Sequence, residues 1–268
     1  MSSKLCATFV FVYFIVLSLN AQATDHPTDA EMEQLLRLGF EDLITVSIAS
    51  KKEETLNDAP SIVAVITADD IQRFGARNLR DVLDRQTSMQ IIGSNLFPHN
   101  KTSVRGVATT YVDSTVLILL NGRPMRESSV SSINHDIYSY FPIDSLQKIE
   151  IIRGPGSVLY GTNAFSGAIN LVTKDAPQEA SANIGVSYGS FGSRQSKITA
   201  GGTWNDLELF GSFQTTDIDG DDFHHINGEF GSNGTYKTGK DGEQLLLNLK
   251  YKGLTVNALH SDTSTDNA

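Results

Sequence analysis

Hydrophobic and polar residues follow two different patterns in two parts of the chain. Between residues 60 and 174, apolar runs alternate with short stretches of helical periodicity, whereas after Pro177 apolar and polar residues alternate with a period of two. A period of two is typical of β-strands that are apolar on one face. The pattern therefore predicts an α+β domain followed by a series of antiparallel strands.

The first region contains strand and helix signals in close succession. Thr67-x-x-Asp70 is a capping box for a short helix that Gly75 ends, and Asn78-x-x-Asp81 opens a second helix. Apolar runs predict strands at residues 62–67, 116–120, 148–152 and 168–173. Asn121-Gly122 follows one of these runs and is a strong signal for a two-residue hairpin. Residues 55–175 thus form one expected small domain.

The second region alternates in runs about as long as the nine to eleven residues that a tilted strand needs to cross a bilayer. We expect strands at residues 182–188, 196–200, 207–214, 244–251 and 254–258. A soluble antiparallel sandwich shows the same alternation, so the alternation alone does not decide between the two. The connections at 188–194 and 201–206 are short and 217–241 is long and polar, which is typical of outer-membrane barrels.

The N-terminus has the pattern of a secretory signal peptide. Lys4 precedes an apolar run from Leu5 to Leu19, and Ala21-Gln22-Ala23 is a small-x-small cleavage site. The run is shorter than the roughly 20 residues of a membrane span. Residues 1–23 are therefore expected to be removed, together with Cys6, which leaves a mature chain without cysteine.

Residues 24–54 are expected to form a short periplasmic segment. Thr28 to Glu31 reads as a capping box for a small helix, and residues 40–50 read as an exposed extended stretch without a fixed partner strand.

Composition and charge indicate a folded protein and argue against binding to nucleic acid. A hydrophobic fraction of 40% with 19% charged residues is that of a folded protein, and the formal net charge is -10. An acidic chain is a poor ligand for nucleic acid, so we expect no nucleic-acid partner.

A longer motif follows the third predicted strand. It runs from Arg153-Gly154-Pro155-Gly156 to Tyr160-Gly161 and continues through Gly167-Ala168-Ile169-Asn170. It resembles the closing segment of the plug domain in TonB-dependent receptors. Earlier signatures of that family resemble Asp58-Ala59-Pro60, Val104-Arg105-Gly106 and Asn121-Gly122-Arg123-Pro124 here, in the same order.

The resemblance implies an α+β plug domain followed by the first antiparallel strands of a transmembrane β-barrel, which has 22 strands in the complete family member. On this basis residues 1–23 are a signal peptide, 24–54 a periplasmic segment, 55–175 the plug and 176–268 an incomplete barrel. About five strands cannot close a barrel, so we expect the sequence to be a fragment of a longer gene product.

The function implied is that of a receptor and transporter in the outer membrane of a Gram-negative bacterium. It would take up a scarce large solute, most often a ferric siderophore in this family, with cobalamin, haem or a glycan as other options. The expected partners are TonB with ExbB and ExbD, outer-membrane lipid and an extracellular ligand such as a metal chelate. The alternative is a binding or signalling module that uses the plug without transport.

TonB grips an extended segment, the TonB box, by strand addition, so the box must be accessible. The residues that fit best are Asp42, Leu43, Ile44, Thr45, Val46 and Ser47, although residues 41–44 could instead extend the preceding helix.

The resemblance also assigns residues to the plug and to the ligand. The resemblance implies that the following motif residues fold the plug and anchor it in the barrel: Arg105, Gly106, Arg153, Gly154, Pro155, Gly161, Gly167 and Asn170. Candidate ligand contacts on the extracellular side are Phe97, His99 and Tyr111, each of which could equally be an ordinary loop or core residue.

Other chemistry has little support. Gly154-x-Gly156 lacks the third glycine of a dinucleotide site, and no catalytic constellation stands out, so we expect neither an enzyme nor a cofactor. The acidic loop Asp217–Asp222 could gather calcium ligands but departs from the EF-hand pattern, and a solvated loop is favoured. His224 and His225 have no third metal ligand in the pattern.

Overall fold

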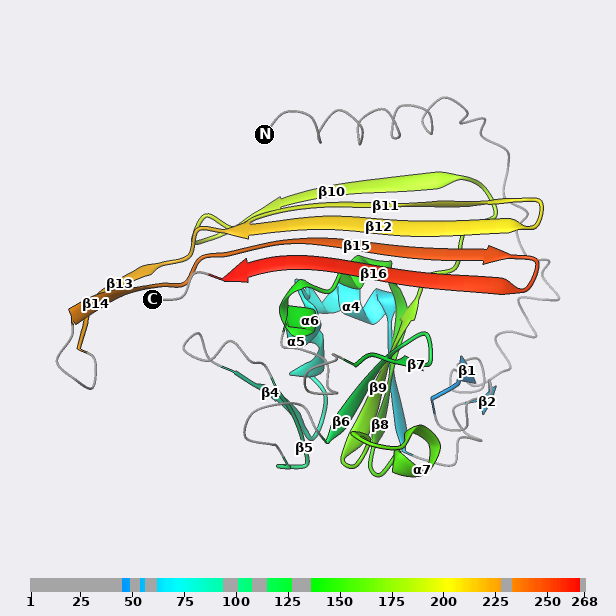
Figure 1. The fold of residues 1–268 in the computed structure, drawn as a ribbon, viewed down its shortest axis with the longest axis horizontal. Helices are drawn as coiled ribbons and strands as arrows, with labels where there is room; N and C mark the ends of the chain where they lie inside the picture. Colours follow the sequence, from blue (N-terminus) through cyan, green and yellow to red (C-terminus); the bar gives the residue numbers. More distant parts are fainter. Residues whose placement is uncertain are drawn as a thin grey trace. The chain divides into compact units, whose positions relative to one another are not determined.

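The computed structural model describes residues 45–48, 54–55, 62–93, 101–107, 115–126, 136–227 and 233–265. All of these residues belong to one compact unit that spans Ile44–Ala268. They form two five-stranded sheets and three two-stranded sheets (Figure 1).

The first five-stranded sheet has the strand order β3-β8-β9-β6-β7. Its strands are β3 (Val63–Thr67), β6 (Val116–Leu120), β7 (Arg123–Pro124), β8 (Leu146–Arg153) and β9 (Gly167–Thr173). The pairs are antiparallel except for β6 with β9, which is parallel. All four strands that the apolar runs predict are present.

Strands β6, β8 and β9 are buried on both faces of this sheet, which explains why they read as nearly continuous apolar runs. Ile118, Ile149 and Ile169 point into the main core, which also contains residues of helices α4 (Ala68–Phe74), α5 (Leu79–Leu83) and α6 (Asp136–Tyr140). Residues adjacent to these on the strands, such as Leu119 and Ala168, point into a second core cluster on the opposite face. The helices therefore cover one face, and the other face is available for another element.

The helix caps agree with the sequence. The Thr67 side chain accepts from the Asp70 backbone N–H at 3.2 Å while Asp70 accepts from the Thr67 N–H at 3.0 Å, and Gly75 ends α4 with a φ of 62°. At α5 the Asn78 side chain accepts from the Asp81 backbone N–H at 2.9 Å. Within the described residues, no helix is both long and apolar enough to cross a membrane.

Several short elements carry no clear pattern in the sequence and were not predicted. These are strand β2 (Glu54–Thr55), the strand pair of β4 (Met89–Ile92) with β5 (Lys101–Val104), the 3-10 helix η3 (Ile143–Ser145) and helix α7 (Ser157–Tyr160). Strand β1 (Thr45–Val46) lies in the extended stretch expected at residues 40–50, but its pairing with β2 was not predicted.

The hairpin between β6 and β7 has the predicted two-residue turn. Asn121 and Gly122 both have positive φ angles, 49° and 76°, and Leu120 pairs with Arg123 on either side of them. Two positive φ angles are the requirement of the type I′ turn, which Asn-Gly meets at least cost.

The second five-stranded sheet is an antiparallel series with the order β10-β11-β12-β15-β16 (Figure 1). Its strands are β10 (Ser181–Tyr188), β11 (Arg194–Trp204), β12 (Leu207–Ile218), β15 (Lys240–Tyr251) and β16 (Leu254–Thr265). Most run several residues beyond the predicted bounds. The loop expected at 217–241 is also wrong in part, because it contains a paired hairpin of β13 (Asp222–Asn227) and β14 (Asn233–Lys237).

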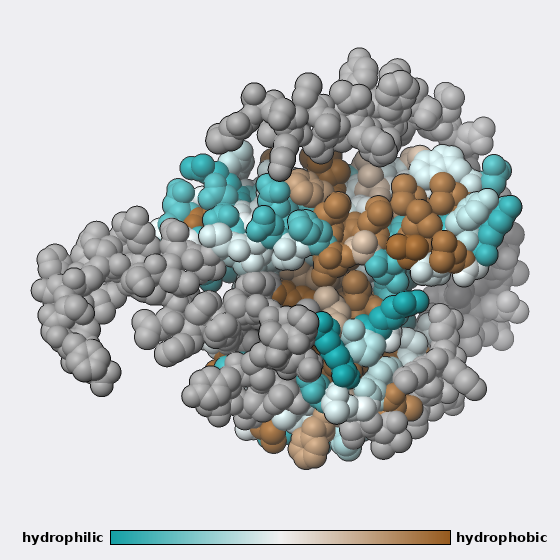
Figure 2. Space-filling view, in the orientation of Figure 1, coloured by the Kyte–Doolittle hydropathy of each residue, from teal (hydrophilic) through white to brown (hydrophobic). Residues whose placement is uncertain are grey.

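This sheet exposes apolar side chains and buries polar ones. Ile184, Val186 and Tyr188 of β10 are 73%, 66% and 81% exposed, whereas Gln214 and Gln244 are buried. In Figure 2 hydrophobic residues gather over part of this sheet, with hydrophilic residues to either side. Such an inverted distribution is the one that a lipid-facing barrel wall requires.

Candidate functional site

A carboxylate is completely buried in the middle of the first sheet. Strand β8 sends Ile149 and Ile151 into the main core, so Glu150 between them points to the opposite face. Its exposed fraction is 0%. Buried glutamates are rare unless they are paired, because removing a charge from water is costly.

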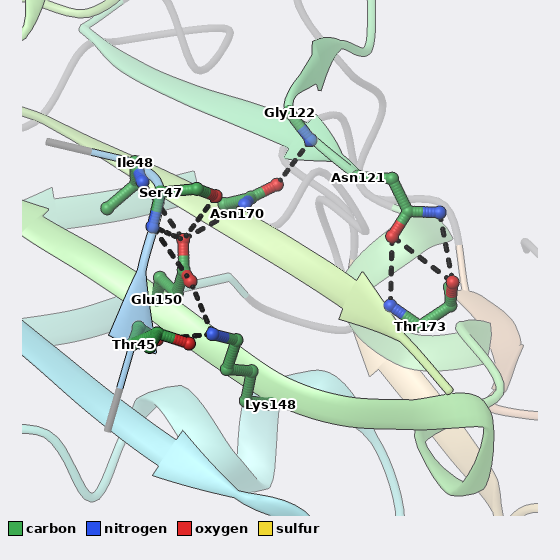
Figure 3. Close-up of polar contacts among 9 residues, drawn as sticks. All are labelled: Thr45, Ser47, Ile48, Asn121, Gly122, Lys148, Glu150, Asn170 and Thr173. Carbon is green, nitrogen blue, oxygen red and sulfur yellow. Dashed lines mark hydrogen bonds and ion pairs between the residues drawn. The ribbon is translucent and has the colours of Figure 1, made fainter. Parts of the chain in front are cut away.

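Glu150 is satisfied by five donors that converge on its two oxygens (Figure 3). The donors are Ser47 N at 3.2 Å, Ser47 Oγ at 3.3 Å, Ile48 N at 3.1 Å, Asn170 Nδ2 at 3.1 Å and Lys148 Nζ at 3.0 Å. Hydrogen bonds to an ionised acceptor are stronger than those between neutral groups. Together these donors reach both carboxylate oxygens of Glu150, and one of them, Lys148, is a cation.

The segment that Glu150 holds, residues 45–48, is also bound through its carbonyl groups. Lys148 Nζ donates to Thr45 O, and Tyr160 OH donates to Ile48 O at 2.9 Å. Val46 is 1% and Ile48 0% exposed, and Ile48 belongs to the second core cluster together with Leu119. We call residues 45–48 the docked segment.

Tyr160 is protonated in this arrangement. Burial, followed by the negative charge of Glu150, raises the pKa of its phenol above the ordinary value of 10.0. A neutral phenol keeps the proton that it donates to Ile48 O, so Tyr160 remains a hydrogen-bond donor throughout the physiological pH range.

The expectation that residues 40–50 are exposed and unpaired is wrong for the docked segment. An exposed strand without a fixed partner was predicted for residues 40–50, yet Val46 pairs with Glu54 of β2 and its side chain is buried. The sequence shows only that the stretch is extended, whereas the side chains that hold it come from residues about 100 positions away. Asp42, Leu43 and Ile44 lie outside the described residues, and the role of residues 42–47 as the TonB box stays a prediction.

Asn170 connects this cluster to the β6–β7 turn. Its amide donates to Glu150 and its Oδ1 accepts from the backbone N–H of Gly122 at 2.8 Å. The neighbouring Asn121 side chain accepts from Thr173 N at 3.0 Å and donates to Asn257 Oδ1 of β16 at 3.2 Å. A chain of polar contacts thus extends from the docked segment through the turn to the second sheet.

Other contacts tie the two sheets together. Asn248 Nδ2 of β15 donates to Thr173 Oγ1 at 2.7 Å, and Lys250 Nζ lies 2.8 Å from Asp175 Oδ1. A polar cavity of 490 Å³ lies between the docked segment and strands β12, β15 and β16, and its lining includes Ser47, Lys148 and Glu150.

The predicted anchoring residues lie around two neighbouring turns. Arg153 Nη1 donates to Thr87 O at 3.3 Å, and the backbone N–H of Arg105 donates to Ser88 O at 2.8 Å. Within the described ranges neither arginine forms an ion pair with a carboxylate, and their role in anchoring stays a prediction.

The predicted glycines occupy distinct places. Gly106 follows Arg105 in its turn, Gly154 and Pro155 precede α7, and Gly161 follows that helix. Gly167 lies in β9, where a Cβ would stand 2.6 Å from the carbonyl oxygen of Ile152. That position requires a glycine.

Other candidates from the sequence contribute little to this site. Phe97, His99 and Tyr111 lie outside the described residues, and His224 and His225 belong to β13. Arg194 lies within 4.0 Å of Asp217 and 3.7 Å of Asp219 in the acidic loop. Among the described residues, no group of three histidine, cysteine, aspartate or glutamate side chains is arranged to hold a metal ion.

Glu150, Lys148 and Tyr160 were missed by the sequence analysis. A signal was available for Glu150, because a single acid flanked by isoleucines in a strand buried on both faces breaks the apolar run. No signal in the sequence pairs it with Ser47 and Ile48.

Comparison with known proteins identifies the first sheet and its helices. Residues 55–168 match the family model described as the TonB-dependent receptor plug domain. The chain carries a TonB-dependent receptor plug domain. The docked segment lies just before this plug domain, and Glu150, Tyr160 and the first residues of β9 lie within it.

Two curated relatives come from outer-membrane systems. The chain is 26% identical over 149 residues to a vitamin B12 transporter BtuB of Photobacterium profundum, which covers 56% of the chain and 23% of the relative. It is also 26% identical over 228 residues to an iron-regulated outer membrane virulence protein of Vibrio cholerae, covering 76% and 34%. The chain therefore spans about a quarter to a third of the length of these relatives.

Solved structures share the fold. The siderophore receptor PirA from Acinetobacter baumannii has a TM-score of 0.58 at 20% identity, covering 76% of this chain and 32% of that one. The pyoverdine outer membrane receptor FpvA from Pseudomonas aeruginosa has a TM-score of 0.60 at 17% identity, covering 82% and 30%.

These comparisons confirm the fold class, a plug domain followed by the first strands of a barrel, and the outer-membrane location. The family consists of receptors and transporters rather than enzymes. The division of the chain into four segments at residues 23, 54 and 175 stays a prediction.

Proposed function

We propose that the chain is part of an outer-membrane receptor that takes up a ferric siderophore with energy supplied through TonB, ExbB and ExbD. The observation that carries the proposal is the pairing of a folded plug domain with strands that expose apolar residues and bury polar ones. The main core of the plug includes Phe210 and Leu246 of those strands, which supports a plug that closes the barrel.

A barrel wide enough for a large solute must be closed when no ligand is bound, because an open pore would leak. The outer membrane offers no nucleotide or ion gradient, so energy has to arrive as a mechanical pull on the plug. The docked segment supports such a pull, because it precedes the plug domain and contacts the middle of its sheet through Glu150.

The choice of ferric siderophore is supported by the relatives. The Vibrio cholerae relative is named as iron-regulated, and the structural neighbours include siderophore receptors. The Photobacterium relative is a vitamin B12 transporter, which makes cobalamin the competing substrate.

Uptake of radiolabelled iron and of radiolabelled cobalamin should be measured in iron-starved cells that express or lack the gene. We expect gene-dependent uptake of iron presented as a ferric siderophore, and its loss in a strain without TonB. If the gene supported uptake of cobalamin alone, the proposed substrate would be wrong, but the proposed transport function would stand. Ligand binding to outer membranes without any uptake would overturn transport and support a binding or signalling module.

A further inference from the structure

We propose that Glu150 is a latch: its carboxylate holds the docked segment on the plug, and release of the segment begins when the Glu150 bonds to Ser47 and Ile48 break. The inference rests on the proposed function only in treating the segment before the plug as the one that TonB pulls. Beyond that function, we infer that Glu150 is the plug residue that determines how readily the docked segment is released.

The docked segment is held mainly by side chains. Among the residues that the structure describes, its backbone pairing with β2 involves Thr45 and Val46. Four of its backbone groups are instead bound by plug side chains: Thr45 O by Lys148, the N–H groups of Ser47 and Ile48 by Glu150, and Ile48 O by Tyr160. Because backbone groups are bound, the contact depends little on which residues occupy the segment.

A carboxylate suits this position better than any other side chain. In the described part of the chain, the five groups that face Glu150 are all donors, and they use both of its oxygens. Glutamine would replace one oxygen by an NH₂ group that can only donate, which leaves donor facing donor. Glutamine has nearly the same size, so it tests the charge and the acceptor and not the packing.

Release of the segment does not leave the Glu150 carboxylate buried without partners. Two of its donors, Asn170 at 3.1 Å and Lys148 at 3.0 Å, belong to the plug sheet itself, so they can stay with Glu150 when the segment leaves. The adjacent polar cavity of 490 Å³ is lined by Ser47, Lys148 and Glu150, so water can reach the groups that separate. A buried ion that kept no partner would make opening very costly, and here it keeps two.

Glu150 binds the docked segment at a point that lies between the candidate TonB box and the rest of the plug in the sequence. Ser47 is the last residue of the candidate TonB box and Ile48 follows it, so tension on the box reaches their bonds to Glu150 before it reaches β3. Asn170 joins Glu150 to Gly122 at the β6–β7 turn, which carries the change to the part of the plug that contacts β16.

Release can be measured on the receptor in outer-membrane vesicles, with Val46→Cys as the reporter. Val46 is 1% exposed, and residues 24–268 contain no natural cysteine, so any cysteine elsewhere in the receptor is first replaced by serine. A bulky maleimide should label Val46→Cys slowly when the segment is docked. Glu150→Gln should raise the labelling rate about tenfold or more, because it weakens several charge-assisted bonds at once. Tyr160→Phe, which loses one donor, should raise it about threefold.

Two controls separate a latch from general damage. Glu179→Gln removes an exposed carboxylate by the same chemical change and should leave the labelling rate unaltered. Leu83→Cys reports on the main core, where Leu83 is 0% exposed, and should stay protected when combined with Glu150→Gln.

An unchanged rate at Val46→Cys in the Glu150→Gln background would overturn the latch. So would equal exposure of Leu83→Cys, because Glu150 would then be a residue of general plug stability. Labelling needs neither siderophore nor TonB. A failure of the uptake experiment with labelling as expected would therefore reject the proposed function alone, and the reverse would reject the latch alone.

Discussion

At the scale of single residues, the plug contains two carboxylates whose roles follow from the donors around them. Glu150 is buried and holds a distant segment, so its contacts cross more than 100 residues of sequence. Asp70 is half-buried and its contacts are local, because it accepts from the N–H of Thr67 at 3.0 Å and from the Thr67 hydroxyl at 2.7 Å. The first arrangement depends on the fold and the second on neighbouring residues alone.

Asp70 gives a pH-dependent contribution to stability. The hydrogen bonds from the Thr67 backbone and side chain lower the pKa of Asp70 below its ordinary value of 3.8. A lowered pKa in the folded state stabilises the protein above the unfolded value, and this contribution is lost as the pH falls through the folded value. We therefore expect Asp70→Asn to lower the free energy of unfolding by about 1 kcal/mol at neutral pH, with the deficit shrinking below about pH 4.

Urea unfolding of the purified protein at several pH values checks this. Asp69→Asn is the matched control, because Asp69 is the exposed neighbour in the same first turn and makes no contact with Thr67 among those described. Equal deficits for Asp69→Asn and Asp70→Asn would show that the helix dipole, and not the capping box, is responsible.

At the scale of elements, β9 shows how closely the strands of the plug approach one another. Gly167 pairs with Val116 on one side and Arg153 on the other, and a Cβ there would lie 2.6 Å from Ile152 O. The oxygen belongs to the backbone of β8 and cannot rotate away. The close approach therefore fixes the residue type.

Gly167→Ala should lower the free energy of unfolding of the plug by about 1 to 3 kcal/mol, the usual cost of overpacking. Gly156→Ala is the control in the same motif, because its Cβ would meet Ala164 Cβ at an ordinary 3.6 Å. Denaturant unfolding followed by near-UV circular dichroism measures both variants. A loss as large for Gly156→Ala would contradict the argument from close approach.

At the scale of the whole molecule, the core of the plug extends into the wall. Leu246 and Leu247 are neighbours on β15, yet Leu246 is 0% exposed within the main core and Leu247 is 36% exposed on the other face. Alternation along a strand places them on opposite sides of the sheet. The plug is thus packed against this wall by apolar contacts as well as by the polar ones of Asn248 and Lys250.

Leu246→Ala should lower the free energy of unfolding in detergent by about 2 to 5 kcal/mol, because it leaves a cavity between plug and wall. Leu247→Ala makes the same chemical change on the exposed face and should cost much less. Unfolding in urea, followed by tryptophan fluorescence of the single Trp204, reports both. If the two leucines proved equally sensitive, the plug would not depend on this contact for stability.

The sequence by itself determined the local and periodic features of this protein. The N-terminal caps of α4 and α5, the Asn121-Gly122 turn and the five alternating strands depend on neighbouring residues or on a repeat of two, and all were predicted. Only the tertiary structure decided which residues of these elements contact one another. The docking of residues 45–48 on Glu150 and the packing of Leu246 in the core of the plug arise from contacts between residues far apart in sequence, and no local pattern records which distant groups will meet.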